Sequence, residues 1–291
     1  MDRVEQHGGE PVNWRLRVVH TTGYRYATAV TQSYNEARLT PRHDDRQNLM
    51  VARLETVPAA RAYKYTDYWG TEVNSFDLHT PHTELKVIAA SVVETSDQTP
   101  PSAEVTWVQL KSPEVLDTYA EYLEWTSYVP KHRELSTVAR SLRRGSTPEE
   151  TVLAVSKWVH DTLKYQRGTT GVHSSAVDAW QAGEGVCQDY AHLTLAMLRA
   201  VGVPSRYVSG YLHTKPDAAV GEKVVGESHA WVEAWTGEWW GFDPTNDISI
   251  GHRHVWVATG RDYADVSPLK GIYSGDAATA IEVTVDMTRL A

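Results

Sequence analysis

The spacing of apolar residues changes once along this chain, and that change limits the folds open to it. Between residues 14 and 95, apolar and polar residues alternate in short runs that stop at Gly, Pro or Asp. A period of two is typical of half-buried β-strands joined by turns, so this part is predicted to be all-β and sandwich-like. Beyond about residue 105, apolar residues recur at helical spacing and short strands follow the helices. Helices followed by antiparallel strands predict an α+β domain.

A small, polar and proline-rich segment, SDQTPPSAE at residues 96–104, lies at this transition and is the best linker candidate. We therefore predict an N-terminal β-sandwich-like domain over residues 12–98 and a second domain over residues 105–291. The core of the second domain is expected at about residues 146–258. A chain of 291 residues is consistent with two modest domains.

The second part contains several elements with recognisable ends. A helix over residues 146–166 opens with Ser146 or Thr147 as N-cap and Pro148 in the first turn. A second helix runs from Cys187 to about residue 201, where Gly202 gives a stop signal. Further helices are predicted over 113–127 and 136–145, strands over 205–212, 228–235, 238–243 and 280–288, and a polar loop over 213–227.

Charge and composition exclude several classes of function. The net charge of −9 and the absence of a basic stripe argue against nucleic-acid binding. No apolar run suggests a signal peptide or a membrane helix, so no membrane partner is expected. A single cysteine excludes an internal disulfide framework and a multi-cysteine metal site. It also fits a reducing compartment, and we predict a cytoplasmic protein without a cofactor.

The only cysteine, Cys187, lies in the segment GEGVCQDYAHLTLAML at the start of the predicted central helix. The positive end of a helix stabilises a thiolate, and its free backbone N–H groups can bind an oxyanion. Gly183 and Gly185 let the chain turn sharply into the helix and leave the sulfur uncrowded. A lone buried cysteine is often inert, so this segment alone leaves a nucleophile and a packing residue both open.

A thiol nucleophile needs a base, and His229 is the best candidate among thirteen histidines. It lies near the start of a predicted strand, in ESHAWVEAW, where the backbone would hold the imidazole steadily. His192 follows Cys187 by five positions on the same helix, points away from it, and is assigned a packing or capping role. Histidines in polar or loop contexts are interpreted as surface residues: His7, His43, His132, His252 and His254.

Asp243, in WWGFDPTN, ends the next predicted strand and is the candidate to orient the imidazole. A three-residue hairpin loop at 236–238 would pair Trp235 with Trp239. His229 and Asp243 would then share one face of the hairpin, whereas a two-residue loop would separate them. The alternative role for Asp243 is a turn at the end of the strand.

At these residues the sequence resembles the transglutaminase-like superfamily, in its bacterial branch with an N-terminal β domain. The resemblance extends upstream through LKYQRGTTGVHSSAVDAWQAG, and HTTGYRYATAVTQSYNEARLTPR resembles the N-terminal region of that branch. It implies a papain-like fold, with Cys187 as nucleophile, His229 as base and acid, and Asp243 as the group that orients the imidazole. No side-chain donor to the oxyanion is assigned, and the candidates are Tyr165, Trp180 and Gln188.

The expected function is that of a cysteine-dependent acyl enzyme acting on amide or peptide bonds, with a peptide or protein as substrate. Hydrolysis, as a peptidase or amidase, is expected because water is the commoner acceptor. Transfer to an amine, as in a transglutaminase, is the alternative and needs a site that excludes water. A catalytically silent binding module is a second alternative, since a fold does not determine a function. The sequence does not predict the oligomeric state.

Two further hypotheses concern other residue types. The three candidate residues could instead bind a metal ion, but zinc sites usually contain close pairs such as CxxC or HxxxH, and the sequence has neither. No metal is therefore expected. Four tryptophans on the predicted strands are candidates to line a peptide groove, and core packing is expected for at least half of them: Trp231, Trp235, Trp239 and Trp240.

Overall fold

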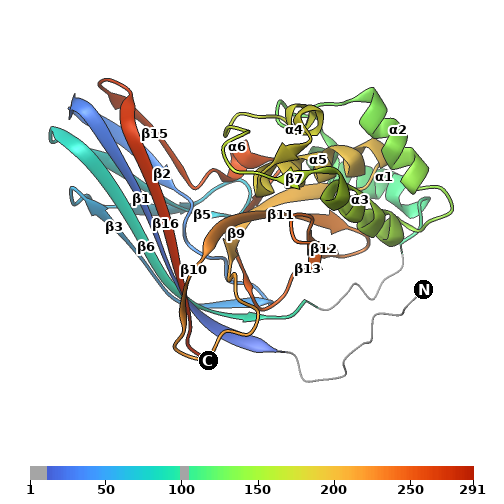
Figure 1. Cartoon of the computed structure of the whole chain (residues 1–291), viewed down its shortest axis with the longest axis horizontal. Helices are drawn as coiled ribbons and strands as arrows, with labels where there is room; N and C mark the ends of the chain where they lie inside the picture. Colours follow the sequence, from blue (N-terminus) through green and yellow to red (C-terminus); the bar gives the residue numbers. More distant parts are fainter. Residues whose placement is uncertain (1–11, 99–104) are drawn as a thin grey trace.

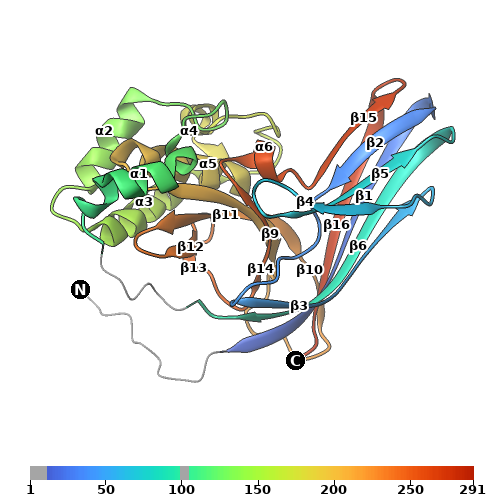
Figure 2. The ribbon, with the colours of Figure 1, turned by 180° about the vertical axis from the view of Figure 1, so that it is seen from behind.

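The computed structural model describes residues 12–98 and 105–291. Its strands form three larger sheets, shown from two sides in Figures 1 and 2. The platform sheet has the strand order β10-β16-β1-β6-β3, the outer sheet β15-β2-β5-β4, and the core sheet β13-β12-β11-β9-β14. The helices gather around the core sheet, while the platform and outer sheets project from it as a separate arm (Figure 1). This is the predicted α+β architecture.

The N-terminal part is all-β over residues 12–98, as predicted. Its burial alternates along β1, where every second side chain from Trp14 to Val18 is buried. Within this part, β2 has no apolar alternation of its own, because its six residues QSYNEA are mostly polar. The strands are β1 (Asn13–Val30), β2 (Gln32–Ala37), β3 (Gln47–Val57), β4 (Tyr63–Thr66), β5 (Glu72–Leu78) and β6 (His82–Ser96).

Segments from the end of the chain complete both N-terminal sheets. The last strand, β16 (Ala278–Arg289), pairs antiparallel with β1 along most of its length, and β15 (Leu269–Ser274) pairs with β2. Figure 1 shows β16, in red, beside β1, in blue. The short strand β10 (Lys223–Val225) pairs in turn with β16, so the prediction of a loop throughout residues 213–227 is wrong at these three residues. The domain limits at residues 98 and 105 stay a prediction, and most of the proposed linker lies outside the described residues.

Several helix ends follow their predicted signals, but the helix predicted over 136–145 runs from Arg133 to Leu142, and the one predicted over 146–166 ends at Thr162. Thr147 caps α3 in a capping box with Glu150, and Gly202 ends α5 in the left-handed conformation at φ 84°. The helix predicted over 113–127 is shorter, because α1 ends at Thr118 and a 3-10 turn follows. The helices are α1 (Pro113–Thr118), α2 (Arg133–Leu142), α3 (Pro148–Thr162), α4 (Ala176–Ala182), α5 (Cys187–Val201) and α6 (Tyr263–Val266), with 3-10 segments η1 (Gln109–Lys111) and η2 (Ala120–Leu123).

The central helix α5 is buried on most sides and packs on β11 and β9 of the core sheet. Just before it, β7 (Lys164–Tyr165) and β8 (Glu184–Gly185) form a short parallel pair that places the start of α5. No helix among the described residues is long and apolar enough to cross a membrane. The core strands are β9 (Ser205–Leu212), β11 (Glu227–Trp235), β12 (Trp239–Asp243), β13 (Ile248–Ser249) and β14 (His254–Gly260).

One face of the platform sheet serves two hydrophobic cores. Near the start of β1, Leu16 and Val18 pack in the cluster that contains α5 and the core sheet. Further along the same face, Tyr26 and Val30 pack with residues of the outer sheet in a second cluster. The middle of this face, between the two cores, lines a cleft.

Candidate active site

Cys187 is the first residue of α5, where the helix meets solvent, and its side chain is partly exposed. The Asp189 carboxylate caps this end by accepting hydrogen bonds from the Val186 N–H at 2.7 Å and the Thr170 hydroxyl at 2.6 Å. A Cβ on Gly185 would lie 2.6 Å from the Asp189 Oδ2 atom, so glycine is needed there to make room for the cap. Asp189 was not among the predicted site residues, although an acidic residue at the third position of a helix was the available signal.

Gly183 has a different role from the one predicted. It has φ 69° and ends the preceding helix α4 in the left-handed conformation, which favours glycine. It therefore ends α4, whereas Gly185 makes room for the Asp189 carboxylate at the start of α5.

The backbone N–H groups of Cys187 and Gln188 have no hydrogen-bond acceptor among the described residues. Both belong to the first turn of α5, whose N–H groups have no partner within the helix. Because they lie beside the sulfur, they offer donors to an oxygen that becomes negatively charged during attack by the thiol.

His229 lies on β11 and connects Cys187 with Asp243. Its Nε2 atom lies 2.7 Å from the Asp243 Oδ2 atom, and Cys187 lies near enough to the ring to raise its pKa. Since Nε2 faces the carboxylate, the Nδ1 atom is the one available to the sulfur. Trp235 pairs with Trp239, which confirms the three-residue hairpin loop that brings the two residues to one face.

Asp243 has both of the roles that the sequence left open. Its Oδ1 atom accepts the backbone N–H groups of Thr245 and Asn246, at 2.9 and 3.2 Å, in a turn that follows the strand. Its Oδ2 atom accepts the His229 ring and the Asn246 side-chain amide, both at 2.7 Å. These contacts leave the buried carboxylate little freedom to rotate.

Opposite effects act on the pKa values of this pair. Burial alone would lower the pKa of His229, but the charge of Asp243 and the hydrogen bonds to Asp243 and Cys187 raise it to about 10. Burial alone would raise the pKa of Asp243, but the charge of His229 and its hydrogen bond keep that pKa well below the usual range. At neutral pH the pair is therefore an imidazolium and a carboxylate.

The histidines interpreted as surface residues have different outcomes. His43 is exposed, His132 and His252 are half-buried, and His7 lies outside the described residues. His254 is buried, so the interpretation is wrong there. Its Nε2 atom lies 3.5 Å from the Asp243 Oδ2 atom, and its Nδ1 atom accepts the Gly251 N–H at 3.3 Å. The packing role of His192 is confirmed, because its ring lies between Tyr128 and Tyr207.

The structure brings together a set of possible metal ligands that differs from the three residues considered from the sequence. Ligand atoms of His229, Asp243 and His254 lie within 4.8 Å of one another. A cation there would have to displace the two 2.7 Å hydrogen bonds that Asp243 accepts through Oδ2. The expectation of a site without metal stays a prediction.

Cys187 and His229 line a cleft with a volume of about 640 Å³. The four strand tryptophans do not line it. Trp231 and Trp240 are buried in the core, which confirms core packing for half of the four, and Trp235 packs against Tyr119. Tyrosines take their place, and among the three oxyanion candidates only Gln188 is present. The aromatic residues of the cleft are Tyr24, Tyr128, Tyr207 and Tyr263, besides the histidines.

The cleft has walls from distant parts of the chain. His20, Thr22 and Tyr24 of β1 form one wall, and the segment from Ser267 to Lys270 forms another. The sequence did not predict that these residues line the cleft, because their position depends on how the platform sheet packs against the core.

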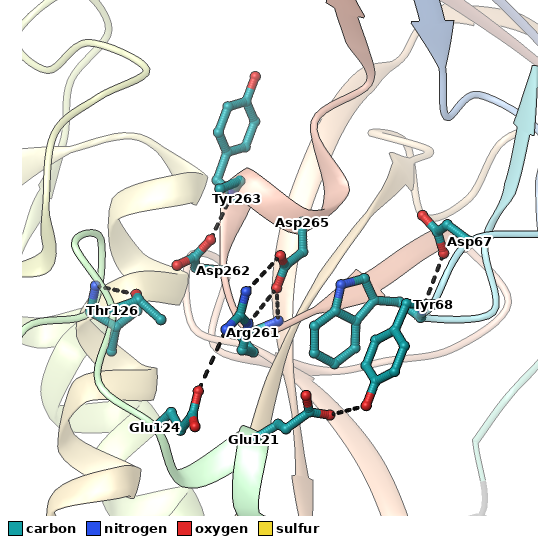
Figure 3. A network of polar contacts seen from close by, with 12 residues as sticks. Asp67, Tyr68, Glu121, Glu124, Thr126, Arg261, Asp262, Tyr263 and Asp265 are labelled. Carbon is teal, nitrogen blue, oxygen red and sulfur yellow. Dashed lines mark hydrogen bonds and ion pairs between the residues drawn. The ribbon is translucent and has the colours of Figure 1, made fainter. Parts of the chain in front are cut away.

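The segment that begins at Arg261, before this second wall, is anchored by ion pairs (Figure 3). The Arg261 guanidinium donates to both carboxylate oxygens of Asp265, at 3.0 and 3.2 Å, and lies 3.5 Å from Glu124. On the neighbouring turn, the Tyr68 hydroxyl donates to Glu121 at 2.8 Å. Arg261 therefore connects α6 with Glu124, which follows η2, and Tyr68 contacts η2 itself through Glu121.

Comparison with known proteins agrees with this arrangement. The family model of the transglutaminase-like superfamily matches residues 136–244, and that of the bacterial transglutaminase-like N-terminal region matches residues 16–94. A Mycobacterium leprae protein described as uncharacterised is 53% identical over 278 residues, covering 96% of this chain and 100% of its own. The chain belongs to the transglutaminase-like superfamily.

Two other comparisons concern proteins with described activities. The solved structure of a "putative cysteine protease" from Cytophaga hutchinsonii has a TM-score of 0.76 at 22% identity, covering 96% of this transglutaminase-like chain and 92% of its own. It shows the same fold. A Pseudomonas aeruginosa protein-glutamine gamma-glutamyltransferase is 29% identical over 127 residues, which is 41% of this chain and 19% of that protein.

Proposed function

We propose that this protein is a cysteine-dependent acyl enzyme that hydrolyses amide or peptide bonds. The observation that carries the proposal is the position of His229, which lies 2.7 Å from the buried Asp243 and lines the same cleft as the only cysteine of the chain. A nucleophile, a base and a group that orients the base are the parts that acyl transfer through a thiol needs. The shared fold with the Cytophaga hutchinsonii protein supports the placement of such chemistry on this scaffold.

In the proposed reaction, the Cys187 thiolate attacks the carbonyl carbon and the carbonyl oxygen takes the negative charge. The N–H groups of Cys187 and Gln188 would stabilise that oxygen. The imidazolium of His229 then gives its Nδ1 proton to the leaving amine, and a thioester remains. Water attacks the thioester and gives one proton to His229; the carboxylic acid is released and the sulfur leaves as a thiolate, which restores the thiolate–imidazolium pair.

Hydrolysis is proposed because the cleft is open to water along the face of the platform sheet, where Val283 and Ile281 are exposed. Transfer to an amine is the second candidate. It is favoured by the sequence similarity to the Pseudomonas aeruginosa gamma-glutamyltransferase, which spans 127 residues. Both reactions pass through the same thioester and differ only in the acceptor.

The first test is alkylation of the folded protein with iodoacetamide at neutral pH, followed by intact-mass analysis. We expect one adduct on Cys187 within minutes and none on a Cys187→Ser variant. Absence of labelling in the folded protein would contradict the proposed nucleophile.

The second test is mass spectrometry of a peptide library incubated with the protein and a small primary amine. Cut backbones or deamidated side chains indicate hydrolysis, and incorporation of the amine indicates transfer. Labelling of Cys187 without conversion of any peptide would favour a catalytically silent binding module.

A further inference from the structure

The outer edge of β16 is paired along only part of its length. From Asp286 to Thr288 it is covered by β10, and the Gly226 N–H donates to the Val285 carbonyl at 2.9 Å. Beyond that point the covering chain leaves the sheet as β11 and continues to His229. Within residues 12–98 and 105–291, no strand pairs with this edge between residues 278 and 284.

The backbone groups on the free part of this edge face away from β1. Val285 points its carbonyl toward Gly226, and in an extended strand the residues two and four positions away point their N–H and C=O groups to the same side. Val283 and Ile281 therefore present unpaired donors and acceptors at the edge. An edge of this kind is a template for another strand.

The side chains of these residues face the cleft. Ile281 pairs with Tyr24 and Val283 with Thr22, and all four line the same cavity as Cys187 and His229. Ile281 is 63% exposed and Val283 is 51% exposed, although they continue a face that is buried at Val285. An apolar surface thus follows the free edge next to the candidate nucleophile.

We propose that an extended substrate peptide with apolar residues adds to the free edge of β16 at Ile281 and Val283 as a further strand of the platform sheet. This inference rests on the proposed function and adds the substrate class. A peptide strand is the expected occupant because β10 and Gly226 already pair with the same edge as far as Val285. Main-chain hydrogen bonds would supply affinity, and alternate side chains of the peptide would lie on Ile281 and Val283.

The test uses an octapeptide of valine and leucine that carries a thiol-reactive aza-epoxide in place of its central peptide bond. The probe extends to both sides of Cys187, and its capture is followed as a covalent adduct by intact mass. Each amide nitrogen of the probe is methylated in turn. We expect methylation at alternate positions on one side of the epoxide to slow capture about tenfold, since each removes a hydrogen bond to the edge. Methylation at the intervening positions changes the rate less than twofold.

A pair of protein variants tests the edge itself. Val283→Pro removes the outward N–H, and proline is tolerated in edge strands where its nitrogen faces solvent. Val283→Ala keeps that N–H and removes two methyl groups, whereas proline keeps an apolar side chain, so slower capture by the proline variant reports the lost N–H. We expect the proline variant to capture the unmethylated probe about tenfold more slowly than the alanine variant. The melting temperature and the rate of alkylation by iodoacetamide should be the same in both.

The outcomes separate this inference from the proposed function. No alkylation of Cys187 by iodoacetamide overturns the proposed function. Normal alkylation together with probe capture that is equally fast at every methylated position, or equal in the proline and alanine variants, overturns strand addition at β16. Failure of the probe to react with an alkylatable Cys187 overturns it as well.

Discussion

The imidazole of His229 lies 2.7 Å from the carboxylate of Asp243, and the two residues reach each other across a hairpin whose loop has three residues. The pairing of Trp235 with Trp239 sets that register. A loop shorter by one residue would place the imidazole and the carboxylate on opposite faces of the sheet. The length of this turn therefore matters as much as the identity of the two residues.

Replacing Asp243 with Asn should move the alkaline limit of activity to lower pH. The proposed reaction needs His229 protonated, so activity is lost as the pH rises through the pKa of His229. That pKa is raised to about 10 against burial, largely through Asp243, and removal of the charge lets it fall. We expect kcat/KM to drop at least a hundredfold and its alkaline limb to shift down by one pH unit or more. The measurement is a pH profile of turnover, with the exposed Asp286→Asn as control. An unchanged alkaline limb would contradict this assignment.

Gly185→Ala should reduce the reactivity of Cys187 without a direct contact to the sulfur. The new Cβ would lie 2.6 Å from the Asp189 Oδ2 atom and push that carboxylate out of its capping position. Loss of a helix cap together with steric strain should destabilise the protein by about 1–3 kcal/mol. Rates of iodoacetamide alkylation and urea unfolding measure the two effects.

Gly171→Ala is the matched control for this change, because a Cβ there meets nothing within 4 Å and the residue belongs to the loop next to the site. Equal alkylation rates for the two alanine variants would show that the Asp189 cap does not position the start of α5.

Glu233→Gln should strongly destabilise the protein. The Glu233 carboxylate is fully buried, accepts from Arg206 at 2.6 Å and from Arg46 at 3.0 Å, and joins the core sheet to the residue just before β3. Removing its charge leaves two guanidinium groups near each other without an anion, which costs about 3–5 kcal/mol. Urea unfolding measures the change. The control, Glu72→Gln in an exposed pair with Lys64, should cost less than about 1 kcal/mol. Similar losses in both variants would be evidence against a structural role for the buried cluster.

Arg261→Ala should loosen one wall of the cleft. Arg261 holds Asp265 of α6 through two hydrogen bonds, and the wall residues from Ser267 to Lys270 follow directly. We expect faster hydrogen exchange over residues 261–270 and a raised KM for peptides, with little change in kcat. Arg53→Ala, in an exposed pair with Glu55, should leave exchange in that segment unchanged. Exchange that stays as slow as in the parent protein would exclude the anchoring role.

Local signals in the sequence determined the helix ends, the hairpin register and the three residues that meet at the candidate site. Thr147 with Glu150, Gly202, and the three-residue loop before Trp239 all act within a few residues, so their effects are visible in sequence spacing. The order of cysteine, histidine and aspartate along the chain, together with the family resemblance, pointed to Cys187, His229 and Asp243 as the candidate site.

Tertiary structure alone decided which distant segments surround that site. His254 lies beside Asp243 although β11 and β9 separate their strands in the core sheet, and β16 reaches β1 from the other end of the chain. The periodicity of a strand shows which face is buried but not which strand lies next to it. Partner choice depends on packing between residues more than two hundred positions apart, as for His20 and Val285. For that reason the walls of the cleft and the free edge of β16 became visible only in the folded molecule.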